Sequence, residues 1–203
     1  MNLTPQQLDL LKELINIGVG KAAGLINQMV NTHVSLELPE ILVLSPNESM
    51  DRLEHGYDQV LSTVRLGFRG PFSGWAGLVF PKQSASWLVS QMLGQDLDGY
   101  SMDLDSLRIG TIQEVGNIVL NGVMGSIVNL LGVGVDYFPP DYFESNIADL
   151  FKDGDLGDRV IILIKARFRL EEAVAEGDIL IFFQMATFEN LLSALDRLLS
   201  QQP

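Results

Sequence analysis

The sequence predicts an α+β fold with approximate two-fold symmetry, in which an internal duplication places two long exposed helices on a β-sheet. Residues 9–39 align without a gap with residues 110–140, at an offset of 101 residues. Residues 74–93 and 177–196 also correspond, since each segment has the pattern of a strand that runs into a helix. Halves this short bury too little surface for separate cores, so we expect one domain over residues 1–203.

The first half, residues 4–98, is predicted to begin with a long helix. Thr4-Pro5-Gln6-Gln7 forms a capping box with proline at the first helical position, and the helical pattern runs to about Val30. Alternation of apolar and polar residues then predicts four strands and a helix. The strands are expected near 32–37, 41–45, 60–68 and 74–80, and the helix at 82–93.

The second half, residues 104–200, repeats this order after a linker from Gly94 to Ser101. A second long helix is predicted over about 104–131, with Asp103 or Asp105 as its N-cap. The remaining elements follow from periodicity. Strands are expected near 133–138, 159–170 and 177–184, and a closing helix at 186–200.

Composition excludes several classes of function. Hydrophobic residues make up 47% and charged residues 19% of the 203 residues, which indicates a folded globular chain. The net charge of −13 disfavours nucleic acid and anionic membranes as partners. The chain has no cysteine, its start has no basic region typical of a signal peptide, and we expect no membrane-spanning window. A cytoplasmic location without membrane insertion is the resulting expectation.

Nucleotide and metal motifs are incomplete. The pair Gly20-Lys21 lacks the upstream glycine of a phosphate-binding loop, because Ile15 stands there, and Ala22 replaces the hydroxyl residue that would contact magnesium. The acidic turn at 153–158 lacks the glycine and glutamate of a calcium loop. His33 and His55 have no second nitrogen ligand at helical spacing, so no metal site is predicted.

A stripe of polar residues runs along each long helix. At about 100° per residue, Asp9, Glu13 and Asn16 share one narrow face, opposite an apolar arc that is expected to be buried. Glu114 and Asn117 hold the same phase in the second helix, opposite the predicted buried residues Ile112, Val115, Ile118 and Val119. Small residues inside both helices predict close backbone packing against the sheet or the other helix: Gly18, Ala22, Ala23, Gly24, Gly116, Gly122 and Gly125.

An exposed Glu and Asn on a helix usually form a solvated face. Here the pair recurs at the same phase in both copies, although asparagine is a mediocre helix residue. Asp9 and Glu13 also form a like-charge pair one turn apart, which does not favour stability. A carboxylate can bind a partner's cation, and a neighbouring amide can orient a water, as a glutamine does in small GTPases. These residues therefore favour a role outside the fold.

The spacing [D/S]-x3-E-x2-N-x22-P resembles the motif of the CheC/CheX/FliY chemotaxis phosphatases. Asp9, Glu13, Asn16 and Pro39 match it in full. The second copy matches at Glu114, Asn117 and Pro140, with Gly110 where Asp or Ser is expected. The resemblance covers essentially the whole chain, and two motifs without further domains look most like CheC.

The resemblance implies a hydrolase that removes phosphate from the aspartyl-phosphate of a CheY-like response regulator in two-component chemotaxis signalling. In that interpretation Glu13 and Glu114 form ion pairs with a receiver lysine, while Asn16 and Asn117 orient the attacking water. Asp9, Pro39 and Pro140 support the motif, and the receiver supplies the Mg²⁺ ion. CheD is a further possible partner.

Two other interpretations remain open. The chain could be a non-catalytic binding module of the same fold, such as a flagellar switch component or a CheD-binding adaptor. It could also be a small-molecule or structural domain in which the two helices only pack.

Overall fold

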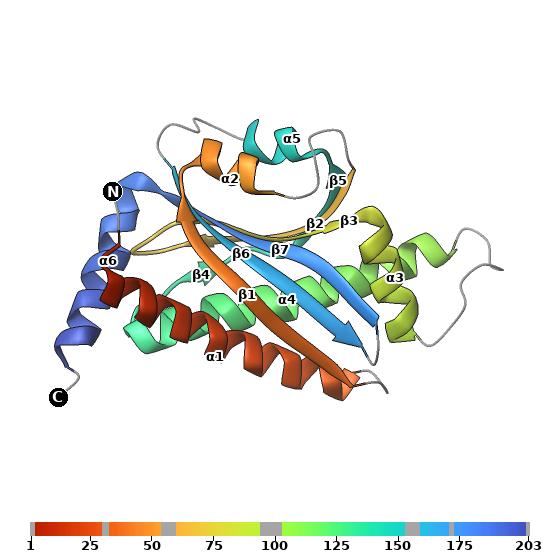
Figure 1. Cartoon of the computed structure of the whole chain (residues 1–203), viewed down its shortest axis with the longest axis horizontal. Helices are drawn as coiled ribbons and strands as arrows, with labels where there is room; N and C mark the ends of the chain where they lie inside the picture. Colours follow the sequence, from red (N-terminus) through yellow and green to blue (C-terminus); the bar gives the residue numbers. More distant parts are fainter. Residues whose placement is uncertain are drawn as a thin grey trace.

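Seven strands from both halves of the chain form one antiparallel sheet in the computed structural model (Figure 1). The structure describes residues 3–29, 33–53, 60–93, 103–152, 159–170 and 173–201. Helices cover both faces of the sheet, which confirms the predicted α+β class. In chain order the elements are α1 (Pro5–Met29), β1 (Val34–Leu44), α2 (Pro46–Arg52), β2 (Leu61–Arg69), β3 (Gly74–Pro81), α3 (Lys82–Leu93), α4 (Asp103–Leu131), β4 (Asp136–Tyr137), β5 (Asp141–Ser145), α5 (Ile147–Lys152), β6 (Arg159–Leu170), β7 (Ala173–Gln184) and α6 (Met185–Ser200).

The order of the strands is symmetric. The sheet runs β1-β6-β7-β3-β2-β4, and β5 also pairs with β2. If β1 is exchanged with the β4–β5 pair, β2 with β6, and β3 with β7, the order reads the same backwards. The arrangement is consistent with an internal duplication, and it joins both halves in one sheet.

Two of the predicted strands form a single strand in the structure, and a third is shorter than predicted. The segments near 32–37 and 41–45 are joined in β1, whose register shifts between Glu37 and Glu40. Pro39 lies in this shift, where a residue without an N–H does not break the ladder. Only residues 136–137 of the predicted strand 133–138 pair with β2. Pro139 and Pro140 follow, and the chain resumes pairing as β5, which the sequence analysis missed.

Two short helices were also missed, although the sequence carries a signal for one of them. Ser45 and Glu48 form a capping box at the start of α2, in which the Ser45 backbone N–H donates to Glu48 at 2.9 Å. At α5, the Asp149 backbone N–H donates to Asn146 Oδ1 at 2.9 Å. Both helices lie on the sheet face opposite α1 and α4 (Figure 1). They cover an apolar layer that includes Leu61, Ile161, Leu163, Leu180 and Phe182.

The larger core lies between the sheet and α1 and α4 (Figure 1). Residues 160–164 of β6 and 179–183 of β7 are buried, because helices cover both faces of these central strands. This explains why both segments are continuous apolar runs without alternation.

Helices α1 and α4 cross at a point of close contact between glycines. A Cβ atom on Gly122 would lie 2.7 Å from the Gly18 carbonyl oxygen, and one on Gly18 would lie 2.6 Å from Ser126 Oγ. The buried Ser126 hydroxyl donates to the carbonyl oxygen of Leu14, across the same crossing. Gly116 packs on Val64 of β2. The prediction of close backbone packing is confirmed at Gly18, Gly116 and Gly122, but Gly24 and Gly125 face open space.

The expectation that no window has the length and apolarity of a membrane span was wrong for α4. Residues 106–131 pass that test by length and composition, but half of the window is buried inside the fold. The helix is apolar because it contacts the sheet on one side and α1 on another. Its composition therefore has an explanation in the core.

Some predictions lie outside the described residues. They concern the linker from Gly94 to Ser101, the acidic turn at 153–158, His55, and the capping side chains of Asp103 and Asp105.

Candidate functional site: two carboxylate–amide pairs on the long helices

The first pair lies on the outer face of α1. Leu11, Leu14 and Ile15 anchor the opposite face in the core, whereas Glu13 and Asn16 are exposed, as the helical periodicity predicts. Asp9 is exposed one turn earlier.

The N-terminus of α1 is held by a capping box and by a hydrogen bond to α6. Thr4 and Gln7 form the predicted capping box, in which the Thr4 N–H donates to Gln7 Oε1 at 2.8 Å and the Gln7 N–H donates to Thr4 Oγ1 at 3.2 Å. The Gln7 side chain also donates to Asp196 of α6 at 2.7 Å. The turn that carries Glu13 and Asn16 therefore extends from an anchored helix end.

The second pair lies on α4. Ile112, Val115 and Val119 are buried as predicted, while Ile118, predicted to be buried, is half-buried. Glu114 is exposed, but Asn117 is half-buried. The two amides therefore differ in their access to a partner.

A neighbouring amide explains part of this difference. Asn121 Nδ2 donates to the Asn117 backbone oxygen at 2.9 Å and to Asn117 Oδ1 at 2.6 Å. The first copy has Gly20 at the matching position, and the Asn16 side chain makes no hydrogen bond to the part of the chain that the structure describes. The sequence analysis did not single out Asn121, although its spacing of four residues from Asn117 was visible.

The residues one turn before each glutamate also differ. Gly110 stands in open space where the first copy has Asp9. Gly110 and Glu114 line a largely apolar hollow of about 330 Å³, together with side chains of α1, α3 and α4 that include Met29, Met92 and Leu107. The second carboxylate therefore has an apolar surrounding, whereas the first has a second acid beside it.

The two motif prolines lie outside the long helices, one within a strand and one next to a strand. Pro39 is exposed in the register shift of β1, and Pro140 directly precedes β5. The Pro140 carbonyl oxygen accepts a hydrogen bond from Gln113 Nε2 at 2.7 Å, which joins β5 to the turn of α4 that carries Glu114. Asn27 joins α1 to β1 in the first copy, because its Nδ2 donates to the Val34 oxygen at 2.8 Å.

The two pairs lie on opposite sides of the helix crossing. Helices α1 and α4 run in opposite directions below the sheet (Figure 1), and each pair lies on the N-terminal side of the crossing glycine of its own helix. At 1.5 Å per residue, Glu13 and Glu114 lie roughly 20 Å apart along the helix axes. They form two separate sites and not one shared centre.

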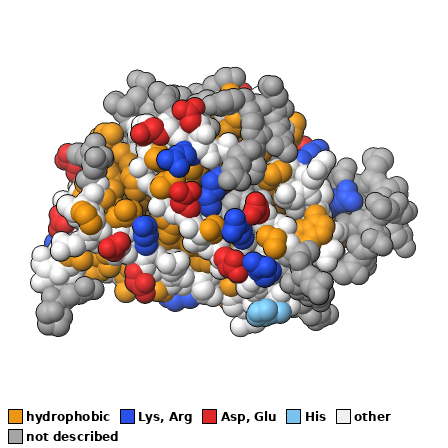
Figure 2. Space-filling model, viewed as in Figure 1, with side chains coloured by type: hydrophobic (Ala, Val, Ile, Leu, Met, Phe, Trp, Pro, Cys, Tyr) orange, Lys and Arg blue, Asp and Glu red, His pale blue; other side chains and the backbone are white. Residues whose placement is uncertain are grey.

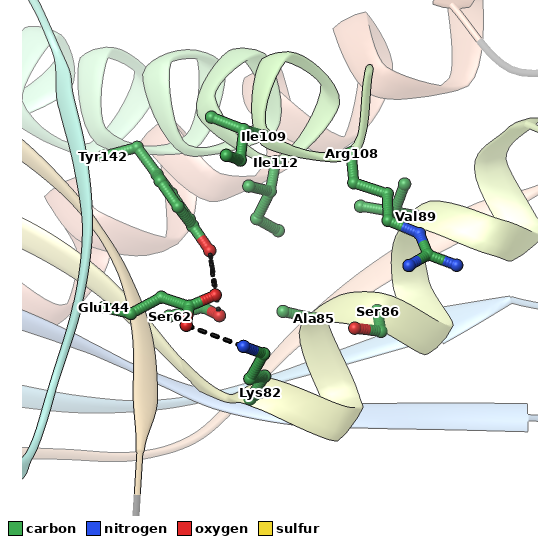
Figure 3. Close-up of a pocket in the computed structure, with 10 residues that line it drawn as sticks. All are labelled: Ser62, Lys82, Ala85, Ser86, Val89, Arg108, Ile109, Ile112, Tyr142 and Glu144. Carbon is green, nitrogen blue, oxygen red and sulfur yellow. Dashed lines mark hydrogen bonds and ion pairs between the residues drawn. The ribbon is translucent and has the colours of Figure 1, made fainter. Parts of the chain in front are cut away.

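A cavity of about 200 Å³ lies elsewhere, between α3, α4, β2 and β5 (Figure 3). Lys82 Nζ pairs with Glu144 at 2.8 Å, and the Tyr142 hydroxyl donates to the other oxygen of Glu144 at 3.0 Å. The hydrogen bond from Lys82 lowers the pKa of Glu144, and burial raises the pKa of Tyr142. The sequence analysis missed this cavity, and neither of the two Glu–Asn pairs lines it.

The face of the molecule seen in Figure 2 has acidic and basic side chains interspersed among hydrophobic ones. Ion pairs also join neighbouring strands of the sheet, such as Arg169–Glu37 at 3.3 Å and Arg167–Glu176 at 2.8 Å. These pairs are exposed, so they contribute little to stability.

The exposed Glu13–Asn16 pair suits a macromolecular partner better than a small molecule. Small-molecule sites enclose most of the ligand in a concave pocket, whereas Glu13 and Asn16 project from the outer face of a helix. A carboxylate and an amide one turn apart, roughly 5–6 Å between Cβ atoms, can pair with a cation and orient a water on a second protein. The reacting group would have to belong to that protein.

Comparisons with known proteins agree with this class. No family model matches the chain. The CheY-P phosphatase CheC of Bacillus subtilis (strain 168) is 26% identical over 126 residues, which cover 62% of this chain and 60% of CheC. The flagellar motor switch phosphatase FliY of the same organism is 22% identical over 200 residues, which cover 96% of this chain and 50% of FliY. The chain thus matches between half and three fifths of the length of these relatives.

Solved structures show the same fold. Thermotoga maritima FliY has a TM-score of 0.75 at 17% identity, and covers 97% of this chain and 99% of its own. The FliM middle domain of H. pylori has a TM-score of 0.67 at 11% identity, over 95% of this chain and 99% of its own. The CheX–CheY–BeF3–Mg²⁺ complex of Borrelia burgdorferi matches with a TM-score of 0.57 at 16% identity, over 84% of this chain and 97% of the matched chain.

The fold and the paired helices define an α+β domain with the same fold as the FliY and FliM middle-domain structures. The chain is a homologue of CheC and FliY, and the resemblance to the CheC/CheX/FliY family is confirmed.

Proposed function

We propose that this chain is a phosphatase that hydrolyses the aspartyl-phosphate of a CheY-like receiver domain. The observation that carries the proposal is the exposed Glu13–Asn16 pair on an anchored helix, repeated as Glu114 and Asn117 on α4. Two homologues named as phosphatases, CheC and FliY, support it.

Each side chain has one role in this mechanism. Glu13 and Glu114 bind a lysine of the receiver and orient the receiver on the helix. Asn16 and Asn117 enter the receiver's phosphorylated pocket, where the amide holds a water in line with the phosphorus. Because an amide does not titrate, it contributes orientation and not proton transfer. Asp9, Pro39 and Pro140 support these residues without contacting the reacting atoms.

The remaining components come from the partner or the cell. The receiver supplies the Mg²⁺ ion, which neutralises charge that develops on the transferred phosphoryl group. A cytoplasmic location follows from such a partner. We also propose CheD as a second partner.

The decisive experiment follows phosphate release from a phosphorylated receiver with its magnesium. We expect the protein to accelerate release, and the Asn16→Ala, Asn117→Ala double variant to lose about 10²-fold or more of that acceleration. Asn16 is exposed and Asn117 is half-buried, so neither side chain belongs to the buried core, and the double variant should keep its circular dichroism spectrum and unfolding midpoint. A Lys12→Ala variant is the matched control, since Lys12 lies on the same helix beside Glu13.

The result that contradicts the proposal is also defined. If the folded double variant accelerates release as strongly as the parent, the amides do not orient the water. If the parent protein has no effect on any phosphorylated receiver tested, the chain is not a phosphatase of this class.

The likeness to the FliM middle domain favours a second candidate, a non-catalytic component of a flagellar switch. Such a module would bind the receiver without accelerating release. Binding of a receiver with unchanged phosphate lifetime would select this candidate over the enzyme.

A further inference from the structure

We propose that Asn121 is a positioning residue that holds the Asn117 amide against α4, so that the second site binds its partner less readily than the first. This inference rests on the proposed phosphatase function and concerns the relative strength of its two sites.

The geometry of α4 shows how Asn121 acts. Its Nδ2 donates to the Asn117 backbone oxygen at 2.9 Å and to Asn117 Oδ1 at 2.6 Å. The bond to the backbone oxygen fixes the Asn121 amide on α4, and the bond to Oδ1 attaches the Asn117 side chain to that amide. Asn117 is half-buried in this position, whereas the equivalent Asn16 is exposed.

The first copy shows the same site without this attachment. Gly20 occupies the position of Asn121 and is exposed. A Cβ built on it meets no atom within 4 Å apart from its chain neighbours and the backbone of its own helix, so packing does not require a glycine there. Glycine within a helix lowers stability relative to alanine, and an amide in this open space would reach Asn16 as Asn121 reaches Asn117. Because Gly20 has no side chain, Asn16 has no neighbouring amide of this kind one turn after it.

The attachment has a predictable effect on kinetics. Asn117 must leave Asn121 before it enters the receiver, so only a fraction of the second sites is competent at any moment. A fractionally populated competent state raises the apparent dissociation constant in inverse proportion to that fraction. One intramolecular hydrogen bond of ordinary net strength corresponds to a change of about two- to tenfold. The effect falls on KM, because the bound Asn117 is already released in the complex.

The first test isolates the second site in an Asn16→Ala background. Adding Asn121→Ala should lower KM for the phosphorylated receiver by about two- to tenfold and leave kcat unchanged. A higher KM or a lower kcat would show that Asn121 assists Asn117, and would overturn the proposal. Helix destabilisation alone does not lower KM, so a merely structural role is distinguished.

The reciprocal test installs the attachment in the first site, in an Asn117→Ala background. Gly20→Asn should raise KM by a similar factor, while Gly20→Ala is the matched control that adds a Cβ without an amide. An equal effect of the two substitutions would mean that bulk, and not the amide, obstructs the site, and would refute the role of the hydrogen bond.

A measurement without a receiver separates this inference from the proposed function. The side-chain amide protons of Asn121 should exchange with solvent more slowly in the parent than in Asn117→Ala, which removes the Oδ1 acceptor. Equal exchange rates would overturn the attachment even if the protein is a phosphatase. Slow exchange in a protein that fails to accelerate phosphate release would leave the attachment established and the phosphatase proposal rejected.

Discussion

Helices α1 and α4 carry the same Glu–Asn pair in different surroundings. Glu13 and Asn16 are both exposed on α1, with Asp9 one turn before and Gly20 one turn after. On α4, Gly110 replaces the acid and Asn121 replaces the glycine, so that an amide holds Asn117. The pair itself is the same in both copies. The residues one turn before and after the pair determine how accessible each amide is to a partner.

The surroundings also differ in the kind of contact they offer. The first site presents two carboxylates at adjacent turns of α1, which attract a basic surface over a Debye length of about 10 Å at 0.1 M salt. The second site presents one carboxylate beside an apolar hollow. Two copies of a helix can therefore carry the same Glu–Asn pair and still differ in how they bind a partner, because the residues one turn away differ.

The largest expected effect is on stability, and it comes from a substitution that disrupts the contact between α1 and α4. In Gly18→Leu, the new side chain would collide with the Gly122 carbonyl oxygen and with Ser126 Oγ, and we expect a loss of about 1–3 kcal/mol in the free energy of unfolding. Urea denaturation measures this loss. Gly24→Ala is the control, because Gly24 faces open space, and alanine should raise stability there by about 0.5–1 kcal/mol. Equal effects of both substitutions would show that the helices do not cross at Gly18.

The next largest effect is on the rate of phosphate release, when each of the two amides is removed in turn. At receiver concentrations below KM, Asn16→Ala should lower the total rate of phosphate release about three- to tenfold, since the remaining second site is held by Asn121. Asn117→Ala should lower the rate by less than half. Initial rates with a phosphorylated receiver give both values, and a greater loss in Asn117→Ala would reverse our ranking of the sites.

The smallest expected effect is on KM, and it comes from exchanging the residues at positions 9 and 110, where one site has an acid and the other a glycine. Asp9→Gly should raise KM of the first site about twofold at low salt and reduce its salt dependence, because one attractive carboxylate is lost. Gly110→Asp should produce the opposite change at the second site, where a new side chain enters open space. KM measured at several NaCl concentrations tests both variants. Identical salt profiles before and after the exchange would rule out an electrostatic role for this position.

Much of the fold and of the site could be predicted from local patterns. The capping box at Thr4 and the helical period placed α1 and the outward direction of Glu13 and Asn16. The apolar runs near residues 160 and 180 placed β6 and β7. The short helices α2 and α5 and the strand β5 were missed, since elements of five to seven residues complete too few periods to stand out from loops.

The sequence by itself determined the two long helices, their repeated motif and the face on which each motif lies, because these depend on residues three or four positions apart. Only the tertiary structure decided the pairing of β1 with β6, the crossing of α1 and α4 at Gly18 and Gly122, and the half-burial of Asn117. Strand pairing and helix crossing join residues more than 100 positions apart. Helical and strand periodicity identifies the buried face of an element, but not the element that covers it.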